Sequence, residues 1–330
     1  MKKFTKMWAI AACALFAGTA AVNAEDYTWK FVTAGDATTY AIRSDGSLWS
    51  WGWNEKGQGG NGVSERTATP TLADGNRVWK KAVGGKAYGF FLAEDGSLWA
   101  AGTHEGGVQG TNDGIDHKVL TRIGTDNDWA DMACSRFWGY SGFAIKTNGT
   151  LWAWGKNSAG QLGIGNTQAQ TAPVQVGADM DWKQVAAGCS SVLALKTDGS
   201  LWGWGFNMYS ELFGHEGKQL SPVRLGSETD WEQVVVIDFR AYAVKKDGTL
   251  WAWGDNANNL LGFNTPTEEE TTAEGNPVEV VTVPQITAPT HVTSIEGKVL
   301  TISGCENTLS VATGTDGVIE KVWMLGSNTD

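Results

Sequence analysis

Hydrophobic residues along this chain fall in short runs separated by glycine-containing turns, and the same arrangement returns about every fifty residues. Each copy ends in a pattern close to Asp-Gly-Ser/Thr-Leu-Trp-x-Trp-Gly. The starts are 50, 53, 50 and 49 residues apart, at Asp45, Asp95, Asn148, Asp198 and Asp247. Self-similarity of this length predicts a solenoid, a propeller or another array of structural repeats.

Each repeat divides into four short pieces that have the character of β-strands. In the fourth copy these are residues 173–176, 182–188, 192–197 and 201–205. Asp198-Gly199 separates the last two, and both residues tolerate the positive φ of a tight hairpin turn. The pattern therefore predicts an all-β protein built from four-stranded antiparallel sheets, each the size of a propeller blade.

Tryptophan marks two of these strands. One Trp opens the second strand, and two more stand two positions apart in the fourth strand and so share a face. The openers are Trp29, Trp79, Trp129, Trp182 and Trp231. Their regular recurrence favours packing between blades, since a buried Trp removes ~200 Å² from water. The alternative is that they form platforms on which sugars stack.

These motifs resemble the RCC1 repeat. The resemblance is carried by Val-Ala-Ala-Gly, by residues 193–205 (Leu-Ala-Leu-Lys-Thr-Asp-Gly-Ser-Leu-Trp-Gly-Trp-Gly) and by residues 154–163 (Trp-Gly-Lys-Asn-Ser-Ala-Gly-Gln-Leu-Gly). It extends over nearly all of the chain after the first two dozen residues. It implies a β-propeller. Such repeats are known in a chromatin-bound guanine-nucleotide exchange factor and in secreted bacterial proteins, one of which inhibits β-lactamase. A fold of this kind hosts many functions.

The repeats predict one domain, residues 25–330, with units at about 29–78, 79–128, 129–181, 182–230, 231–286 and 287–330. A long acidic loop is expected at about 262–283. The last unit is a weakened copy, and the chain stops where another Pro-Val-Gln-Val strand would begin. We therefore expect six blades, closed by joining N- and C-terminal strands, which would remove exposed strand edges. Seven blades or an open arc are the alternatives.

The first two dozen residues differ from the rest. Lys2, Lys3 and Lys6 precede an apolar stretch, and residues 22–24 (Val-Asn-Ala) end it, as in a signal peptide cleaved after Ala24. This predicts a secreted or periplasmic protein. Residues 10–13 also look like a lipoprotein box, but cleavage there would leave a very short apolar region before Cys13. No other stretch of the sequence is long and apolar enough to span a membrane.

The charge of the chain bears on its possible partners, and the number of cysteines bears on disulfide bonding. Cleavage would remove three lysines and no acid, leaving 22 basic and 36 acidic residues, a formal charge of −14. An acidic surface repels nucleic acid. Cys134, Cys189 and Cys305 would remain, an odd number, and we interpret them as buried small apolar residues.

The sequence contains no recognisable catalytic or cofactor motif. It has no HExxH, no G-x-S-x-G, no Walker loop and no CxxC, and the four histidines fall in loops of different units. Residues 255–259 only partly follow a calcium loop. We therefore expect no cofactor, no metal and no catalysis.

Antiparallel strands place the Asp-Gly turns at one end of the disc and two sets of variable loops at the other. The variable end carries aromatic residues and Arg, the types that dominate binding hot spots. Each ring could instead fold back as a plug. The predicted binding residues are Trp53, Tyr88, His104, Trp138, Tyr140, Phe206, Met208, Tyr209, Phe239 and Arg240.

These residues predict a binding scaffold that engages a protein partner through its variable loops. A carbohydrate-binding module is the main alternative, and a propeller enzyme with a site in its central funnel is a further one. Exchange activity on a nuclear GTPase, which the family name suggests, disagrees with both the signal peptide and the acidic charge.

Overall fold

The computed structural model describes residues 28–136, 139–257, 260–263, 268–271, 277–280, 285–305 and 308–326. Within these residues nearly every element is a strand, as the repeat pattern predicts. The strands of blades 1 to 3 are β1 (Trp29–Ala34), β2 (Thr38–Arg43), β3 (Leu48–Gly52), β4 (Thr67–Asp74), β5 (Trp79–Gly84), β6 (Tyr88–Ala93), β7 (Leu98–Gly102), β8 (His117–Arg122), β9 (Trp129–Cys134), β10 (Ser141–Lys146), β11 (Leu151–Gly155) and β12 (Gln170–Gln175), with the short 3-10 helix η1 (Glu105–Gly107) in blade 2.

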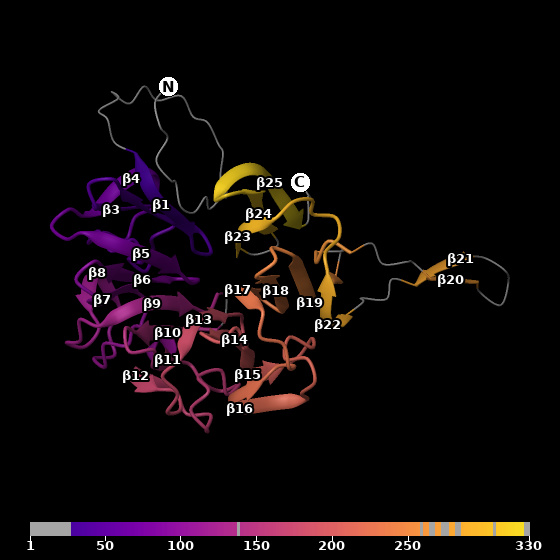
Figure 1. The fold of residues 1–330 in the computed structure, drawn as a ribbon. Helices are drawn as coiled ribbons and strands as arrows, with labels where there is room; N and C mark the ends of the chain where they lie inside the picture. The colour runs from indigo at the N-terminus through magenta and orange to yellow at the C-terminus, as the bar shows by residue number, and fades with distance from the viewer. Residues whose placement is uncertain are drawn as a thin grey trace.

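The second half of the chain continues the arrangement. Its strands are β13 (Trp182–Ala187), β14 (Ser191–Lys196), β15 (Leu201–Asn207), β16 (Gly217–Arg224), β17 (Trp231–Ile237), β18 (Arg240–Lys245), β19 (Leu250–Asp255), β20 (Glu268–Thr271), β21 (Pro277–Val280), β22 (Gln285–His291), β23 (Val299–Cys305), β24 (Thr308–Thr315) and β25 (Val318–Gly326). Six antiparallel sheets follow one another around a central axis (Figure 1), so the prediction of a six-bladed propeller is confirmed.

Two details of the predicted strand order are wrong. The sequence pattern groups the segment that contains Pro173 with the strands after it, but β12 pairs with β11, so this segment is the outermost strand of the preceding blade. The two chain ends also lie in different sheets: β1 belongs to β1-β2-β3-β4, and β25 belongs to β23-β24-β25. Both differences have one cause, since each outer strand folds back through its own exit loop onto the strand before it.

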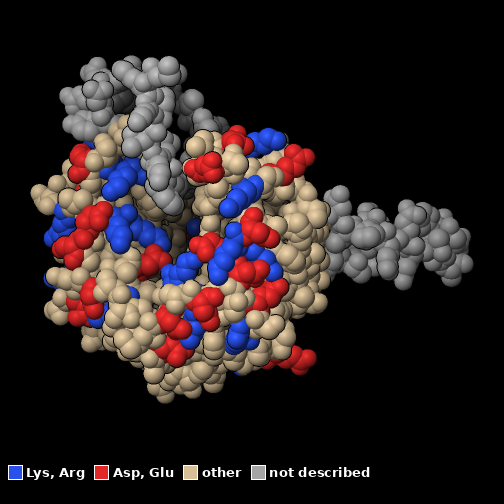
Figure 2. All heavy atoms as spheres, viewed as in Figure 1, with Lys and Arg blue, Asp and Glu red and all other residues tan. Residues whose placement is uncertain are grey.

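The inner strands of all six blades surround a central channel of about 350 Å³, lined by residues of β1, β5, β9, β13, β17 and β23. Figure 2 shows Lys and Arg side chains interspersed with Asp and Glu around this central hollow. The mixture of signs means that the mouth of the channel carries no extended field of a single sign on this face.

The acidic segment in unit 5 contains more structure than a loop. β20 and β21 pair as an antiparallel hairpin that projects away from the disc (Figure 1). Among the described residues no helix is long and apolar enough to cross a membrane.

The apolar core is divided among the interfaces between blades. Five clusters of buried residues each join one blade to the next, from blades 1 and 2 through blades 5 and 6. The tryptophans of blades 2 to 5 lie within these clusters: Trp182 packs against both Trp202 and Trp204, with ring centroids 6.0 Å apart in each case. The paired tryptophans therefore share one face as predicted, and their role is packing.

Candidate functional site

The two ends of the propeller are defined by backbone hydrogen bonds that recur from blade to blade among the described residues. At one end the residue after Trp-x-Trp-Gly donates to the carbonyl of the β-hairpin before it, as Phe206 does to Ser190 over 2.9 Å and Asp255 does to Phe239 over 3.0 Å. At the other end the opening Trp of a blade bonds to the Gly of the preceding turn, as Trp231 does to Gly199. We call these the loop end and the Asp-Gly end.

The Asp-Gly end repeats one hydrogen-bonded turn. Asp198 Oδ1 accepts the Ser200 N–H at 2.8 Å and the Ser200 hydroxyl at 2.6 Å, while Ser200 Oγ accepts the indole N–H of Trp202 at 2.9 Å. Four other blades contain the same chain of bonds, beginning at Asp45, Asp95, Asn148 and Asp247. The Asp-Gly-Ser-Leu-Trp motif is therefore a side-chain-bonded turn that fixes the first Trp of each pair.

Three blades add a lysine held between two tryptophans at this end. Lys196 Nζ lies 5.0 Å from the ring centroid of Trp182 and 4.6 Å from that of Trp202, and it pairs with Asp179 at 2.7 Å and Asp181 at 3.0 Å. Lys146 and Lys245 are held in the same way. Partial burial opposes the charge, but the paired carboxylates prevail and raise the pKa of Lys196.

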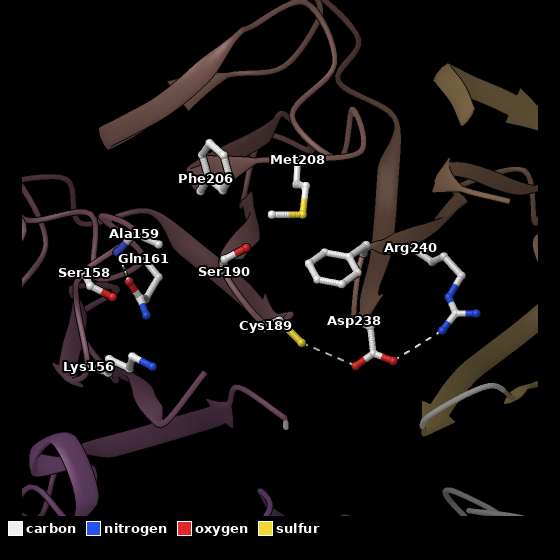
Figure 3. A pocket seen from close by; sticks show the side chains of 11 residues that line it. Lys156, Ser158, Ala159, Gln161, Cys189, Ser190, Phe206, Met208, Asp238 and Arg240 are labelled. Carbon is white, nitrogen blue, oxygen red and sulfur yellow. Dashed lines mark hydrogen bonds and ion pairs between the residues drawn. The ribbon is translucent and has the colours of Figure 1, made fainter. Parts of the chain in front are cut away.

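A cleft of about 500 Å³ opens at the loop end between blades 3, 4 and 5. It is lined by Lys156, Ser158, Ala159, Gln161, Cys189, Ser190, Phe206, Met208, Asp238, Phe239 and Arg240. Figure 3 shows Phe206 and Met208 on one wall, Lys156 and Gln161 to one side, and Asp238 with Arg240 opposite them. Four of the predicted binding residues, Phe206, Met208, Phe239 and Arg240, are thus brought together.

The floor of the cleft is a polar junction between blades 4 and 5. Arg240 Nη2 lies 3.3 Å from Asp238 Oδ2, and the Cys189 thiol donates to Asp238 Oδ1 over 3.6 Å (Figure 3). Burial raises the pKa of the Asp238 carboxyl, while Arg240 and Cys189 partly offset the rise. Gly188 permits the close approach of the blades, because a Cβ there would stand 2.4 Å from the Asp238 carbonyl oxygen.

Tyr209 belongs to the same end but rests on a buried carboxylate. Its ring centroid lies 4.9 Å from that of Phe239, and its N–H donates to Glu211 Oε2 over 2.8 Å. The corresponding side chain in blade 3 is Gln161, which accepts the Ala159 N–H at 2.9 Å. Burial raises the pKa of Glu211 to about 7, because the Tyr209 and Ser191 hydrogen bonds only partly compensate for lost hydration.

The remaining predicted residues do not line the cleft. Tyr88 is fully buried and Tyr140 is 4% exposed, with ring centroids 5.9 Å apart, so both are packed between blades 2 and 3. Trp53 is half-buried on blade 1, and His104 is exposed on blade 2 with Nδ1 2.6 Å from Asp116 Oδ1. Trp138 lies outside the described residues.

Sequence reasoning missed several residues of the cleft. Lys156 stands at the same exit position as Phe206, and Cys189 and Asp238 lie within two residues of the end of the inner strand of their blades. The signal was a change of residue type at matching repeat positions. Cys134 is buried as predicted, whereas Cys189 is half-buried and lines the cleft.

The described residues show no cluster of three or more His, Cys, Asp or Glu side chains that could hold a metal ion. His104 and His117 instead pair singly with Asp116 and Asp113. The chemistry that the cleft offers is therefore apolar contact combined with hydrogen bonds and fixed charges.

Two segments of the chain, residues 45–92 and 148–195, match the Regulator of chromosome condensation (RCC1) repeat, and residues 29–58 match a second form of it. Among curated proteins, the ultraviolet-B receptor UVR8 of Arabidopsis thaliana is 30% identical over 48% of this chain, and human protein RCC2 is 27% identical over 44%. The matches span only 37% and 19% of those two proteins.

Solved structures show the same fold over nearly the whole chain. Human WBSCR16 has a TM-score of 0.73 at 16% identity and covers 92% of this chain and 78% of its own. Yeast RCC1 (Prp20) bound to Kap60 has a TM-score of 0.72 at 18% identity and covers 92% and 67%. With its repeat motifs, its blade architecture and these relatives, the chain belongs to the RCC1-repeat family of β-propellers.

Proposed function

We propose that this protein is a secreted or periplasmic, non-catalytic scaffold that binds a protein partner at its loop end, with the cleft between blades 3, 4 and 5 as the anchoring site. RCC1-like propellers act as protein-binding scaffolds: yeast Prp20 has been crystallised with Kap60, and its binding to Gsp1p and histones has been described. Those partners belong to Prp20, and the partner of the present chain has to be inferred from its own surface.

One observation carries the proposal. Phe206, Met208 and Phe239 lie beside Lys156 and Arg240 in a single open cleft at the end where the repeats diverge. Aromatic residues, Met and Arg are enriched in protein–protein interfaces, and Arg is among the residues that most often carry the binding energy. The cleft therefore suits an apolar anchor of a partner, with polar groups around it to fix its orientation.

The cleft is also held in shape by the fold. Gln161 is fixed by its bond to Ala159, and Asp238 holds both Arg240 and Cys189. A pre-formed site of this kind loses little conformational freedom when a ligand binds, which favours affinity.

Photocrosslinking tests the location of binding. We would place p-benzoylphenylalanine at Met208, which is 47% exposed at the loop end, and in a second protein at Met180, which is 61% exposed next to the Asn148-Gly149 turn. The proposal expects one specific protein adduct from position 208 and none from position 180. An adduct from position 180 alone would place binding at the Asp-Gly end.

The compartment is tested separately. Cell fractionation and N-terminal sequencing should find the mature chain outside the cytoplasm and beginning at Glu25. A cytoplasmic chain that retains Met1 would contradict the proposed location but not the proposed binding end.

A further inference from the structure

One wall of the cleft is fastened to its blade through a buried acid. The wall consists of residues 208–215, in the exit loop between β15 and β16, and we call them the wall segment. Met208 lines the cleft, and the Tyr209 ring centroid lies 4.9 Å from that of Phe239, another lining residue. Glu211, two positions further along, is fully buried. The place of the wall therefore depends on how Glu211 is held.

Two other blades have a neutral amide where blade 4 has this acid. Gln58 of blade 1 and Gln161 of blade 3 stand at the matching position, and each side-chain carbonyl accepts the backbone N–H two residues earlier, at 3.1 Å and 2.9 Å. Glu211 Oε2 accepts the Tyr209 N–H in the same way at 2.8 Å. Blade 4 thus keeps the shape of the loop but builds it on a group that titrates.

The negative charge of Glu211 is weakly compensated. The Tyr209 N–H and the Ser191 hydroxyl, which donates to Oε1 over 3.3 Å, are both uncharged donors. Glu211 forms no ion pair with any described residue, and Asp255 of β19, which acts on it, carries a charge of the same sign. Burial without a cation favours the neutral carboxyl, so the pKa of Glu211 rises to about 7.

The protonated form also suits the site better in its hydrogen bonds. At the matching position of blade 3, the Gln161 amide accepts the Ala159 N–H and donates to the Gly139 carbonyl over 3.5 Å. A protonated carboxyl likewise has one acceptor and one donor, whereas a carboxylate has acceptors only. Ionised Glu211 therefore gains most by reaching water.

The wall segment has the features of a region that opens locally. Met208 is 47% exposed, and a Cβ at Gly214 would meet no atom within 4 Å. Ser210, directly before Glu211, has a φ of 67°, in the left-handed region that costs a non-glycine residue free energy. Exposure, sparse contacts and backbone strain all lower the cost of opening such a loop while the blades stay folded.

We propose that ionisation of Glu211 opens the wall segment, so that the cleft is complete in mildly acidic solution and loses its Met208 wall in alkaline solution. The inference rests on the proposed function, because it regulates the same binding site. The closed segment binds the proton more tightly than an open, hydrated one. Its advantage is full below pH 4.5, is lost as the pH rises to 7, and stays lost above that value. A partner anchored in the cleft therefore binds more tightly at pH 5.5 than at pH 8.

Other titratable or charged groups lie on the elements around the wall segment. Burial also raises the pKa of Asp238, but Arg240 Nη2 lies 3.3 Å from its carboxylate and supplies the cation that Glu211 does not have among the described residues. An imidazole changes its charge between pH 5 and 8, so His215 needs its own control. Besides Asp255, the groups are Cys189, Asp238, Arg240, Tyr242, Arg224 and His215.

Hydrogen–deuterium exchange of the purified protein tests the opening without a partner. We would measure the peptide that covers residues 208–216 at pH 5.5 and pH 8 and divide its rates by those of the same peptide in the unfolded chain. The proposal expects protection of this peptide to fall at least tenfold at pH 8. Amides of β11, at the centre of blade 3, should keep their protection at both pH values.

Two substitutions assign the effect to the carboxyl group. Glu211→Gln should fold, since Gln occupies the matching position in blades 1 and 3, and its wall segment should stay protected to within twofold between pH 5.5 and pH 8. This variant keeps His215, so it is also the control for the imidazole. Gln161→Glu should introduce the same fall of protection in the exit loop of blade 3.

Three results would overturn the proposal. The first is equal protection of the wall segment at the two pH values. The second is an undiminished fall in Glu211→Gln, which would assign the opening to another group, such as His215. The third is an equal loss of protection in β11, because the acid would then weaken the whole fold and not the wall.

Crosslinking separates this switch from the binding function. With p-benzoylphenylalanine at position 208, the partner adduct should be at least fivefold more abundant at pH 5.5 than at pH 8, and Glu211→Gln should remove the difference. Equal adduct at both pH values in the parent protein would contradict the regulation. A pH-dependent exchange of the wall segment without any adduct would support the opening and contradict the proposed binding alone.

Discussion

The two ends of this propeller are made by the same strands, yet they treat the repeated sequence differently. At the Asp-Gly end, five blades reproduce one chain of hydrogen bonds from Asp or Asn through Ser or Thr to Trp. At the loop end the backbone bond recurs, but the side chain that it presents changes from Trp53 to Thr103, Lys156, Phe206 and Asp255. The first end stabilises the blades, and the second provides individual chemistry.

Repetition and variation are therefore separated within one repeat of about fifty residues. The lysine held between Trp182 and Trp202 satisfies its charge locally and presents little of itself to solvent. The residues around Met208 leave an open cleft instead. If this division is correct, replacing an exposed side chain at the loop end should weaken partner binding and leave the stability of the fold unchanged.

The largest effect is expected from Trp204→Ala. This indole is fully buried between blades 3 and 4 and supports the loop end through its bond to the Gln161 carbonyl. Loss of a buried Trp should lower the free energy of unfolding by about 3–5 kcal/mol. Urea denaturation measures this, and Trp202→Ala, at the Asp-Gly end, should cost less because Trp202 is only partly buried. Equal losses of stability for the two variants would show that the deeper burial of Trp204 does not set its contribution.

Glu211→Gln should produce the next largest change, a gain in stability at neutral pH. The folded pKa of about 7 lies above the ordinary value of 4.5, so the folded state binds the proton more tightly. The stability tied to this proton is present below pH 4.5, is lost as the pH rises to 7, and stays lost above it. Removing the charge should therefore stabilise the protein by about 2–3 kcal/mol at pH 8.

The pH dependence provides the control for this substitution. The parent protein should lose stability between pH 4.5 and 7 at this site, and Glu211→Gln should show a smaller loss over that interval in urea denaturation at several pH values. Gln161→Glu, which places a carboxyl at the matching position of blade 3, should enlarge the loss. A parallel pH profile for Glu211→Gln and the parent would show that the buried carboxyl does not titrate in this window.

Lys196→Met should have the smallest effect on stability, about 1–2 kcal/mol, since it removes two cation–π contacts and two ion pairs with partly exposed acids. Lys183→Met is the matched control, because Lys183 is 37% exposed and, among the described residues, its ion pair is with the exposed Glu232. We expect less than about 0.5 kcal/mol for this control in the same denaturation experiment. A larger loss for Lys183→Met would contradict the idea that the tryptophans strengthen the Lys196 site.

Much of the fold could be predicted because each repeat contains residues that are typical of a tight turn. Asp198, Gly199 and Ser200 identify a tight turn from sequence alone, and antiparallel strands then assign all such turns to one end. The partner of the strand containing Pro173 could not be predicted in this way. This strand, β12, lies between β11 and β13 along the chain. Its pairing with β11 depends on how the exit loop between them folds.

The cleft was predicted less completely than the blades. Tyr88 and Phe239 both follow a variable loop, but Tyr88 meets Tyr140 of the next blade and is buried, whereas Phe239 meets Tyr209 and lines the cleft. Such outcomes depend on contacts between blades, which no pattern within one repeat contains. The junction of Cys189, Asp238 and Arg240 is likewise formed by two blades.

If the loop end is the recognition surface, the affinities of two methionine variants for the partner will differ. With the partner obtained by crosslinking, Met208→Lys should raise Kd by roughly thirtyfold, about 2 kcal/mol, and Met180→Lys should leave it unchanged. Both side chains are exposed, so both proteins should unfold at the same urea concentration as the parent. A loss of affinity in Met180→Lys with none in Met208→Lys would contradict the account.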